Sequence, residues 1–331
     1  MKIAITGVTS GVGRRFAEMA IERGHTVRGL VRQPDRDDAT ALRKLGVDTV
    51  PGDILDRNSV RALCEEADAV VHMAALVGDW GPREQFDRIN VGGTRVAIEA
   101  AADSGAERFV HLSSTSVYGR PEKGRITERW PTRIHGVPYD DSKTASERIA
   151  FELGKERGLG VAAVRPPVIY GPYDRNFMPR MLKMIRSGRM VLIDGGTAPM
   201  NVVWADHVVD VCLLCLDKQD AVGEAFNVMD TVDQRPPSVR EVGETAARAA
   251  GLHPPSRSVP YLAATAIAQL VSSAFTLARS SKPPPLTPFV VKLMTLDVIY
   301  DSTKAVEKLG WRPQMDPLEG IAQFASAFDS R

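Results

Sequence analysis

The fold of this chain is decided by the stretch "TGVTSGVGRR" at residues 6–15. It follows an apolar run at residues 2–6 and leads into residues 14–24, whose apolar spacing predicts an amphipathic helix that ends at a glycine. A glycine-rich loop between a buried strand and a helix lets a pyrophosphate approach the free N–H groups of the helix N-terminus. The loop therefore predicts a dinucleotide-binding site. The expected contact residues are Gly7, Thr9, Ser10, Gly11, Val12 and Gly13.

Strand and helix patterns continue to alternate through the first half of the chain. Apolar runs at residues 25–32, 67–75 and 108–114 have the character of buried strands, and helical patterns lie between them. This alternation predicts an α/β fold of the Rossmann type, in which a doubly wound parallel sheet has helices on both faces.

The second half of the chain has a different composition. Three proline-rich stretches, "QRPPS", "HPPS" and "KPPPLTP", interrupt the alternation that holds up to about Tyr173. We expect residues 1–172 to form the dinucleotide-binding domain, with a strand and a helix returning to it around residues 201–230. Residues 173–200 and 231–331 would form a smaller substrate-binding lobe.

Composition excludes several classes of protein. The 42 Lys and Arg residues nearly balance the 41 Asp and Glu residues, which argues against a nucleic-acid partner. Three cysteines are too few for a disulfide framework, and the N-terminus shows no leader pattern, so a cytoplasmic location is expected. The six histidines have no ligand spacing, and no metal site is expected. Cys212 and Cys215 lie in an apolar helical pattern, which favours core thiols.

The glycine loop resembles that of the short-chain dehydrogenase/reductase superfamily, in its extended, two-lobe branch (the epimerase/dehydratase type). That branch usually has TGxxGxxG, so Ser10 occupies the position of its middle glycine, whereas Gly11 matches the TGxxxGxG of single-lobe members. The resemblance spans nearly the whole chain, including "NVGGT" and "LGWRP". It implies a nicotinamide dinucleotide as cofactor.

The end of the second predicted strand favours NADP(H), with NAD(H) as the alternative. A carboxylate there would bind the ribose hydroxyls of NAD, whereas this chain has Val31 followed by Arg32, and a guanidinium can bind a 2′-phosphate. The resemblance implies further cofactor contacts along the chain. They are Asp53 and Ile54 at the adenine, Ala74 and Ala75 along the ribose and pyrophosphate, and Pro166 and Val168 beside the nicotinamide.

Tyr139 and Lys143, in "YDDSK", are four residues apart and would share one helix face. A nearby ammonium lowers the pKa of a phenol from its usual value near ~10. The same spacing occurs at Tyr300 and Lys304, but only the first pair follows a strand that ends in hydroxyl residues. The resemblance implies that Ser114 binds the substrate oxygen and that Tyr139 transfers the proton. It implies that Lys143 lowers the Tyr139 pKa and holds the nicotinamide ribose.

The expected substrate is a small apolar carbonyl compound or secondary alcohol. Thr115 and Ser116 replace the Asp–Glu pair of sugar-nucleotide dehydratases, and Met200 and Asn201 stand where epimerases usually carry a diphosphate-binding arginine. The second half is most similar to 3β-hydroxysteroid dehydrogenase and dihydroflavonol reductase relatives. A sugar-nucleotide epimerase and a non-catalytic NADP-sensing regulator are the alternatives. Trp80 is expected near the nicotinamide, as a substrate contact.

Two other segments predict surfaces. The apolar stretch at residues 261–278 is interrupted by polar residues, so we expect a helix that covers the substrate pocket rather than an integral membrane span. Peripheral contact of this helix with lipid is a further interpretation. Residues 84–105 and the helix after Tyr139 correspond to the helices that relatives pair in a four-helix interface, which implies a homodimer.

Overall fold

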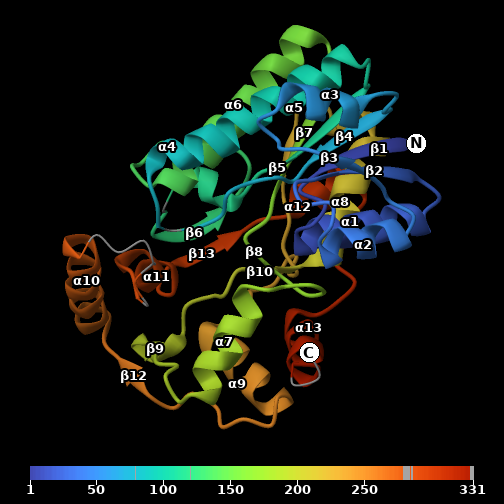
Figure 1. Cartoon of the computed structure of the whole chain (residues 1–331). Coiled ribbons are helices and arrows are strands. Elements are labelled where there is room, and N and C mark those ends of the chain that lie inside the picture. Colours follow the sequence, from blue (N-terminus) through green and yellow to red (C-terminus); the bar gives the residue numbers. More distant parts are fainter. Residues whose placement is uncertain (79, 120, 279–283, 285, 329–331) are drawn as a thin grey trace.

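A computed structural model of the chain describes residues 1–78, 80–119, 121–278, 284 and 286–328. Its centre is a sheet of seven strands in the order β11-β7-β5-β4-β1-β2-β3, in which every neighbouring pair is parallel (Figure 1). The strands are β1 (Lys2–Thr6), β2 (Thr26–Val31), β3 (Asp48–Pro51), β4 (Ala69–His72), β5 (Arg108–Leu112), β7 (Gly160–Arg165) and β11 (Ala225–Asn227). The predicted Rossmann-type fold is confirmed.

Helices cover both faces of this sheet (Figure 1). On one face, the side chains of Ile3 and Ile5 pack in a core with α1 (Gly11–Glu22), α2, α8 and α12, whereas Ala4 points to the opposite core with α3, α5 and α6. The other bounds are α2 (Asp37–Lys44), α3 (Arg57–Cys64), α5 (Gly93–Asp103), α6 (Pro138–Arg157), α8 (Ala205–Asp217) and α12 (Thr303–Leu309). Burial on both faces explains the nearly continuous apolar strands.

The strand order reverses at β1, which defines where a ligand binds. The chain runs from β1 to β2 and β3 on one side and then crosses to β4 on the other. Thr6 pairs with His72 at the carboxyl ends of β1 and β4. Ligands of open parallel sheets bind in the crevice beyond such a switch point. The glycine loop, which follows Thr6, begins at this crevice.

A third core lies outside the sheet. It is formed by α7 (Phe177–Arg186), α9 (Val239–Ala249) and α13 (Pro317–Ser326), together with residues of β8 (Val168–Tyr170) and β10 (Val202–Trp204). Short parallel pairs join distant segments: β8 with β10, β9 (Leu192–Ile193) with β12 (Ser258–Val259), and β6 (Lys123–Ile126) with β13 (Asp297–Tyr300).

The shorter elements are α4 (Arg83–Phe86), α11 (Pro288–Leu293), the π-helical turn η1 (Asp87–Gly92) and the 3-10 turns η2 (Thr115–Tyr118), η3 (Asp194–Gly196) and η4 (Gln219–Ala221). The helix predicted from Asn90 is present as η1 followed directly by α5. Cys212 and Cys215 are buried in α8, as predicted for core thiols.

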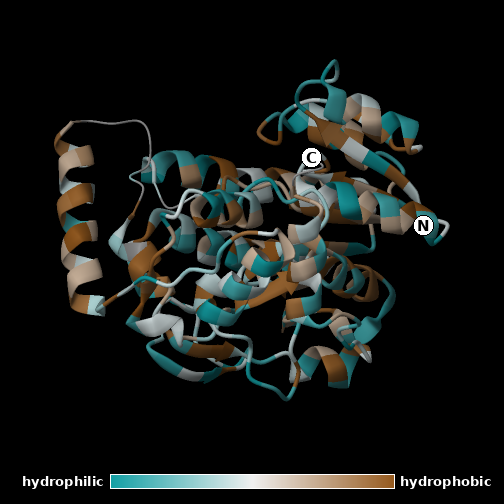
Figure 2. Ribbon diagram, turned by 90° about the horizontal axis from the view of Figure 1, so that it is seen from below, coloured by the Kyte–Doolittle hydropathy of each residue, from teal (hydrophilic) through white to brown (hydrophobic). Residues whose placement is uncertain are grey.

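The predicted apolar helix is α10 (Tyr261–Leu277), which stands at the outer edge of the molecule (Figure 1). Ala264 and Ala268 pack against Val291 and other residues, whereas Leu262 and Leu277 are 79% and 85% exposed. Figure 2 shows this helix at one side of the molecule, with hydrophobic residues along its length. Within the described ranges, no helix is both long and apolar enough to cross a bilayer.

Candidate active site

The glycine loop is closed by its own backbone and by the end of β4. The Ser10 hydroxyl caps α1 by accepting from the Gly13 N–H at 3.0 Å, and the Ser10 N–H donates to the Gly7 carbonyl at 3.0 Å. A Cβ on Gly13 would lie 2.2 Å from the Gly7 oxygen, and one on Gly7 would lie 2.7 Å from the Ala74 nitrogen. Gly7 also has φ +77°. The glycines therefore allow a tight turn in which the backbone at the N-terminus of α1 can come close to a pyrophosphate.

The expected adenosine end lies beside this loop. Val31 is buried at the end of β2, and Arg32 directly after it is exposed. Asp53 accepts from the Leu55 N–H at 2.9 Å, and Ile54 is buried. A Cβ on Gly93 would lie 2.9 Å from the Ile54 side chain, so the start of α5 packs directly on this residue.

Ser114, Tyr139 and Lys143 meet at the carboxyl edge of β5. Ser114 caps η2 just beyond β5, where its hydroxyl accepts from the Ser116 N–H at 3.1 Å, and it acts to lower the pKa of Tyr139, which lies in the first turn of α6. One turn later, the Lys143 ammonium donates to the carbonyl of Leu112, the last residue of β5, at 2.6 Å. The carboxyl end of β5 thus brings together the hydroxyl groups of Ser114 and Tyr139 and the amine of Lys143.

Burial is the main cause of the pKa shifts of both Tyr139 and Lys143. Burial, together with the nearby Asp140 carboxylate, raises the pKa of Tyr139 to about 12, against the opposing effect of the Ser114 hydrogen bond. Burial lowers the pKa of Lys143 to about 8, against the attraction of Glu147. Lys143 is not among the causes of the Tyr139 shift in this structure, in which the ammonium is directed at the Leu112 carbonyl, and the lowering of the Tyr139 pKa by Lys143 stays a prediction. The phenol keeps its proton at neutral pH, which is the form that can donate to a carbonyl oxygen.

The second tyrosine–lysine pair is not arranged in the same way. Tyr300 ends β13, whereas Lys304 lies on α12 and donates to the Ala225 carbonyl at 2.9 Å. The four-residue spacing does not place Tyr300 and Lys304 on one helix face, because the two residues do not share a helix. Tyr300 nevertheless stacks on Tyr118 with ring centroids 6.0 Å apart, and Thr115 acts to lower its pKa, a proximity to the candidate site that the sequence did not indicate.

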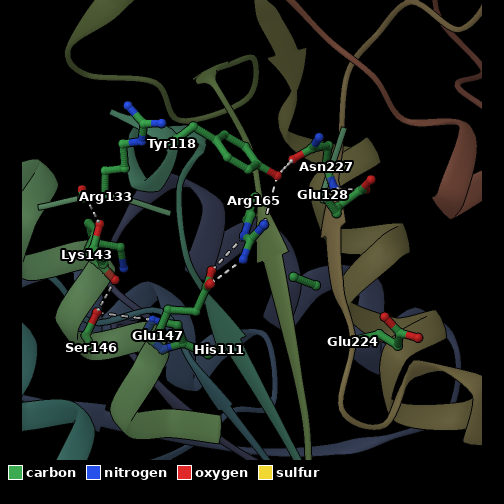
Figure 3. A network of polar contacts seen from close by, with 12 residues as sticks. His111, Tyr118, Glu128, Arg133, Lys143, Ser146, Glu147, Arg165, Glu224 and Asn227 are labelled. Atoms are coloured by element: carbon green, nitrogen blue, oxygen red, sulfur yellow. Dashed lines mark hydrogen bonds and ion pairs between the residues drawn. The ribbon is translucent and has the colours of Figure 1, made fainter. Parts of the chain in front are cut away.

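A buried polar network lies beside Lys143 (Figure 3). This network was not predicted from the sequence. Arg165 on β7 donates to Glu147 at 2.8 Å and to the Tyr118 hydroxyl at 2.8 Å. That hydroxyl donates to the Asn227 side chain at 2.6 Å. Glu147 lies one turn after Lys143 on α6, so the network joins that helix to β7 and β11. The signal available in the sequence was the charge of Arg165 within the apolar run "GVAAVRPP".

The remaining predicted contacts lie on segments that follow the strands β1, β4 and β7. The Ala74 N–H donates to the Thr6 hydroxyl at 3.3 Å, and the Pro166 carbonyl accepts from the Thr115 N–H at 3.0 Å. Val168 starts β8. Trp80 lies half-buried between β4 and α4.

The family model described as the NAD dependent epimerase/dehydratase family matches residues 3–228. The chain belongs to this family. The match includes the glycine loop, Ser114, Tyr139 and Lys143. Family membership implies a nicotinamide cofactor, and the tight glycine loop at the N-terminus of α1, whose backbone packing leaves no room for a Cβ at Gly7 or Gly13, fits such a group.

Individual relatives support the same assignment. The 2-alkyl-3-oxoalkanoate reductase of Stenotrophomonas maltophilia is 26% identical and covers 99% of both chains. The 3β-hydroxysteroid-dehydrogenase/decarboxylase isoform 2 of Arabidopsis thaliana is 27% identical over 87% of this chain and 53% of its own length. The UDP-glucose 4-epimerase of Thermotoga maritima, solved with UDP-glucose, has the same fold, with a TM-score of 0.78 at 21% identity over 100% of this chain and 99% of its own. The protein is an NAD(P)-dependent oxidoreductase of this family.

Proposed function

We propose that the protein transfers hydride between NADP(H) and a carbonyl group or secondary alcohol of an apolar substrate. The observation that carries this proposal is the meeting of Ser114, Tyr139 and Lys143 beyond β5, at the crevice that the glycine loop borders. Nicotinamide supplies or accepts the hydride when it is bound. The side chains of this chain supply the proton, the orientation and the charge stabilisation.

Each of the three residues has a separate role in this proposal. The Ser114 hydroxyl, which already acts on the pKa of Tyr139, would donate to the substrate oxygen and stabilise the negative charge that develops there. Tyr139 would give its proton to that oxygen, and its raised pKa keeps the proton available in the direction of reduction. Lys143 would leave the Leu112 carbonyl or share its three N–H donors with the cofactor ribose.

The second half of the chain favours an apolar substrate. Asn201, which stands where epimerases usually carry an arginine, donates to the Val298 carbonyl at 2.8 Å and accepts from the Tyr300 N–H at 3.4 Å. Its amide thus joins β10 to β13 rather than offering a cation for a diphosphate. The names of the reductase and the hydroxysteroid dehydrogenase among the relatives also point to apolar ketones and alcohols. Likeness in fold to a UDP-glucose 4-epimerase keeps that activity as the second candidate.

A substrate series tests the proposal. We expect NADPH-dependent reduction of 3-oxoalkanoates and ketosteroids, with kcat/KM rising as apolar groups are added, by at most about 4-fold per buried CH₂. Oxidation of NADPH is followed by absorbance, and UDP-glucose with NAD is the parallel arm. Epimerisation of UDP-glucose without reduction of any apolar ketone would replace this proposal with the epimerase.

The cofactor preference is tested at Arg32. Because a charge-assisted contact with a 2′-phosphate is lost, Arg32→Ala should weaken NADPH binding by about 10- to 100-fold and leave NADH binding nearly unchanged. Fluorescence titration of both reduced cofactors measures these affinities. Arg61→Ala, at an exposed arginine on α3, is the matched control and should change neither. Equal affinity of the unmutated protein for NADPH and NADH would contradict the preference.

A further inference from the structure

Two guanidinium groups lie against one carboxylate at the expected adenosine end of the crevice, and a third, that of Arg14, which is paired with Glu18 at 3.2 Å, adds its charge. Arg175 donates to both oxygens of Asp38, at 3.3 and 3.0 Å, and Arg36 lies 3.6 Å from the same carboxylate. The hydrogen bond from Arg175, with the charges of Arg175, Arg36 and Arg14, lowers the pKa of Asp38. We call Arg14, Arg36, Arg175 and Asp38 the Asp38 cluster. Its carboxylate is ionised and faces an excess of positive charge.

Arg175 reaches this cluster from a segment that crosses the glycine loop. In residues 171–176, which we call the strap, the Tyr173 carbonyl would lie 2.7 Å from a Cβ on Gly11. The Arg14 guanidinium lies 4.0 Å from the centre of the Tyr173 ring, and the Tyr173 hydroxyl donates to Glu18 at 2.7 Å. Tyr173 itself has φ +65°, a costly backbone conformation for tyrosine. The strap is thus held against α1 by Tyr173 and against α2 by Arg175.

The position and chemistry of the cluster fit a phosphate monoester. Asp38 lies in the first turn of α2, a few residues beyond the carboxyl end of β2, where dinucleotide folds bind the adenosine ribose. A phosphate dianion carries more charge and more acceptor oxygens than a carboxylate, so it is the stronger partner for several guanidinium groups. Arg36 and Arg175 are 63% and 58% exposed, and a ligand can reach both.

We propose that the arginines of the Asp38 cluster bind the 2′-phosphate of NADP(H), and that Asp38 is an internal anion that competes with this phosphate for Arg175 and Arg36. The inference rests on the proposed use of NADP(H). To the expected contact of Arg32 it adds contacts from Arg14 on α1, from Arg36 directly before α2 and from Arg175 in the strap. In this arrangement the 2′-phosphate accepts the hydrogen bonds of Arg175 in place of Asp38, and the strap stays over the bound dinucleotide. NAD(H), which has no 2′-phosphate, leaves the hydrogen bonds between Arg175 and Asp38 unchanged.

The competition predicts a variant that binds better than the natural protein. Asp38→Asn removes one negative charge and keeps the shape, so the dissociation constant for NADPH should fall by about 5- to 30-fold, while that for NADH stays within about 2-fold. Calorimetric titration with adenosine 2′-monophosphate should show the same gain, and adenosine 5′-monophosphate should show none. Asp48→Asn is the matched control, because Asp48 is paired with Arg28 at 2.9 Å on β3, outside the cluster.

A second variant tests the strap. Arg175→Gln should weaken NADPH binding by about 10-fold and hardly affect NADH, and Arg175→Lys should restore part of the loss. If Asp38→Asn weakens NADPH and NADH equally, Asp38 contacts the ribose or supports the fold, and the inference is wrong. If all variants bind the two cofactors equally, the inference is wrong but hydride transfer by NAD(P)H stands. Binding of neither cofactor would overturn the proposed function as well.

Discussion

Tyr139→Phe should lower kcat by about 10²- to 10⁴-fold while the affinity for NADPH stays nearly unchanged. The substitution keeps the ring, which packs edge-on against Phe86 with centroids 6.3 Å apart, and removes only the hydroxyl. The substrate oxygen would then lose its proton donor. Initial rates with a reducible carbonyl compound and NADPH give kcat, and a fluorescence titration gives the affinity.

The matched comparison is Tyr300→Phe. Tyr300 is buried, and burial raises the pKa of its phenol to about 12, as it does for Tyr139. Because Tyr300 has no lysine on the same helix and ends a strand, we expect its loss to change kcat by a few-fold at most. Full activity in Tyr139→Phe together with a large loss in Tyr300→Phe would reverse the assignment.

Arg165→Ala should lower the free energy of unfolding by about 3–5 kcal/mol. The side chain is buried between Glu147 and Tyr118, and its removal leaves the Glu147 carboxylate without its partner in a site that water does not reach. Urea unfolding followed by circular dichroism measures the change.

Two further variants test whether the loss of stability comes from the unpaired buried Glu147 carboxylate or would follow the removal of any charged side chain. Arg165→Met combined with Glu147→Leu should recover much of the stability, because neither buried charge then lacks a partner. Arg157→Ala, at a pair in which Arg157 and Asp103 are 46% and 57% exposed, should cost less than about 1 kcal/mol. An equal loss in Arg165→Ala and Arg157→Ala would contradict the role of the buried pair.

The parts of the structure that the sequence predicted depend on short-range patterns. Alternating strand and helix patterns identify the parallel sheet, since its strands are buried on both faces. The helix pitch places Tyr139 and Lys143 on adjacent turns of α6, and the end of β5 brings Ser114 to them.

The parts that were missed depend on contacts between distant residues. Tyr118 and Asn227 are 109 positions apart, and no local periodicity connects them. The direction of the Tyr139 pKa depends on burial and on where the Lys143 ammonium points, which residue spacing does not specify. Arg175 and Asp38, 137 positions apart, meet only because the strap returns across the glycine loop.

The place of β11 in the sheet has a consequence for how the chain is made. Ribosomal synthesis delivers Arg165, at the end of β7, well before Asn227, the residue that completes its hydrogen-bonded surroundings through Tyr118. Between them lie α7 and α8, so a nascent chain that ends before β11 has an open sheet edge at β7. The edge of β7 is therefore protected from pairing with other chains only after the ribosome has synthesised β11.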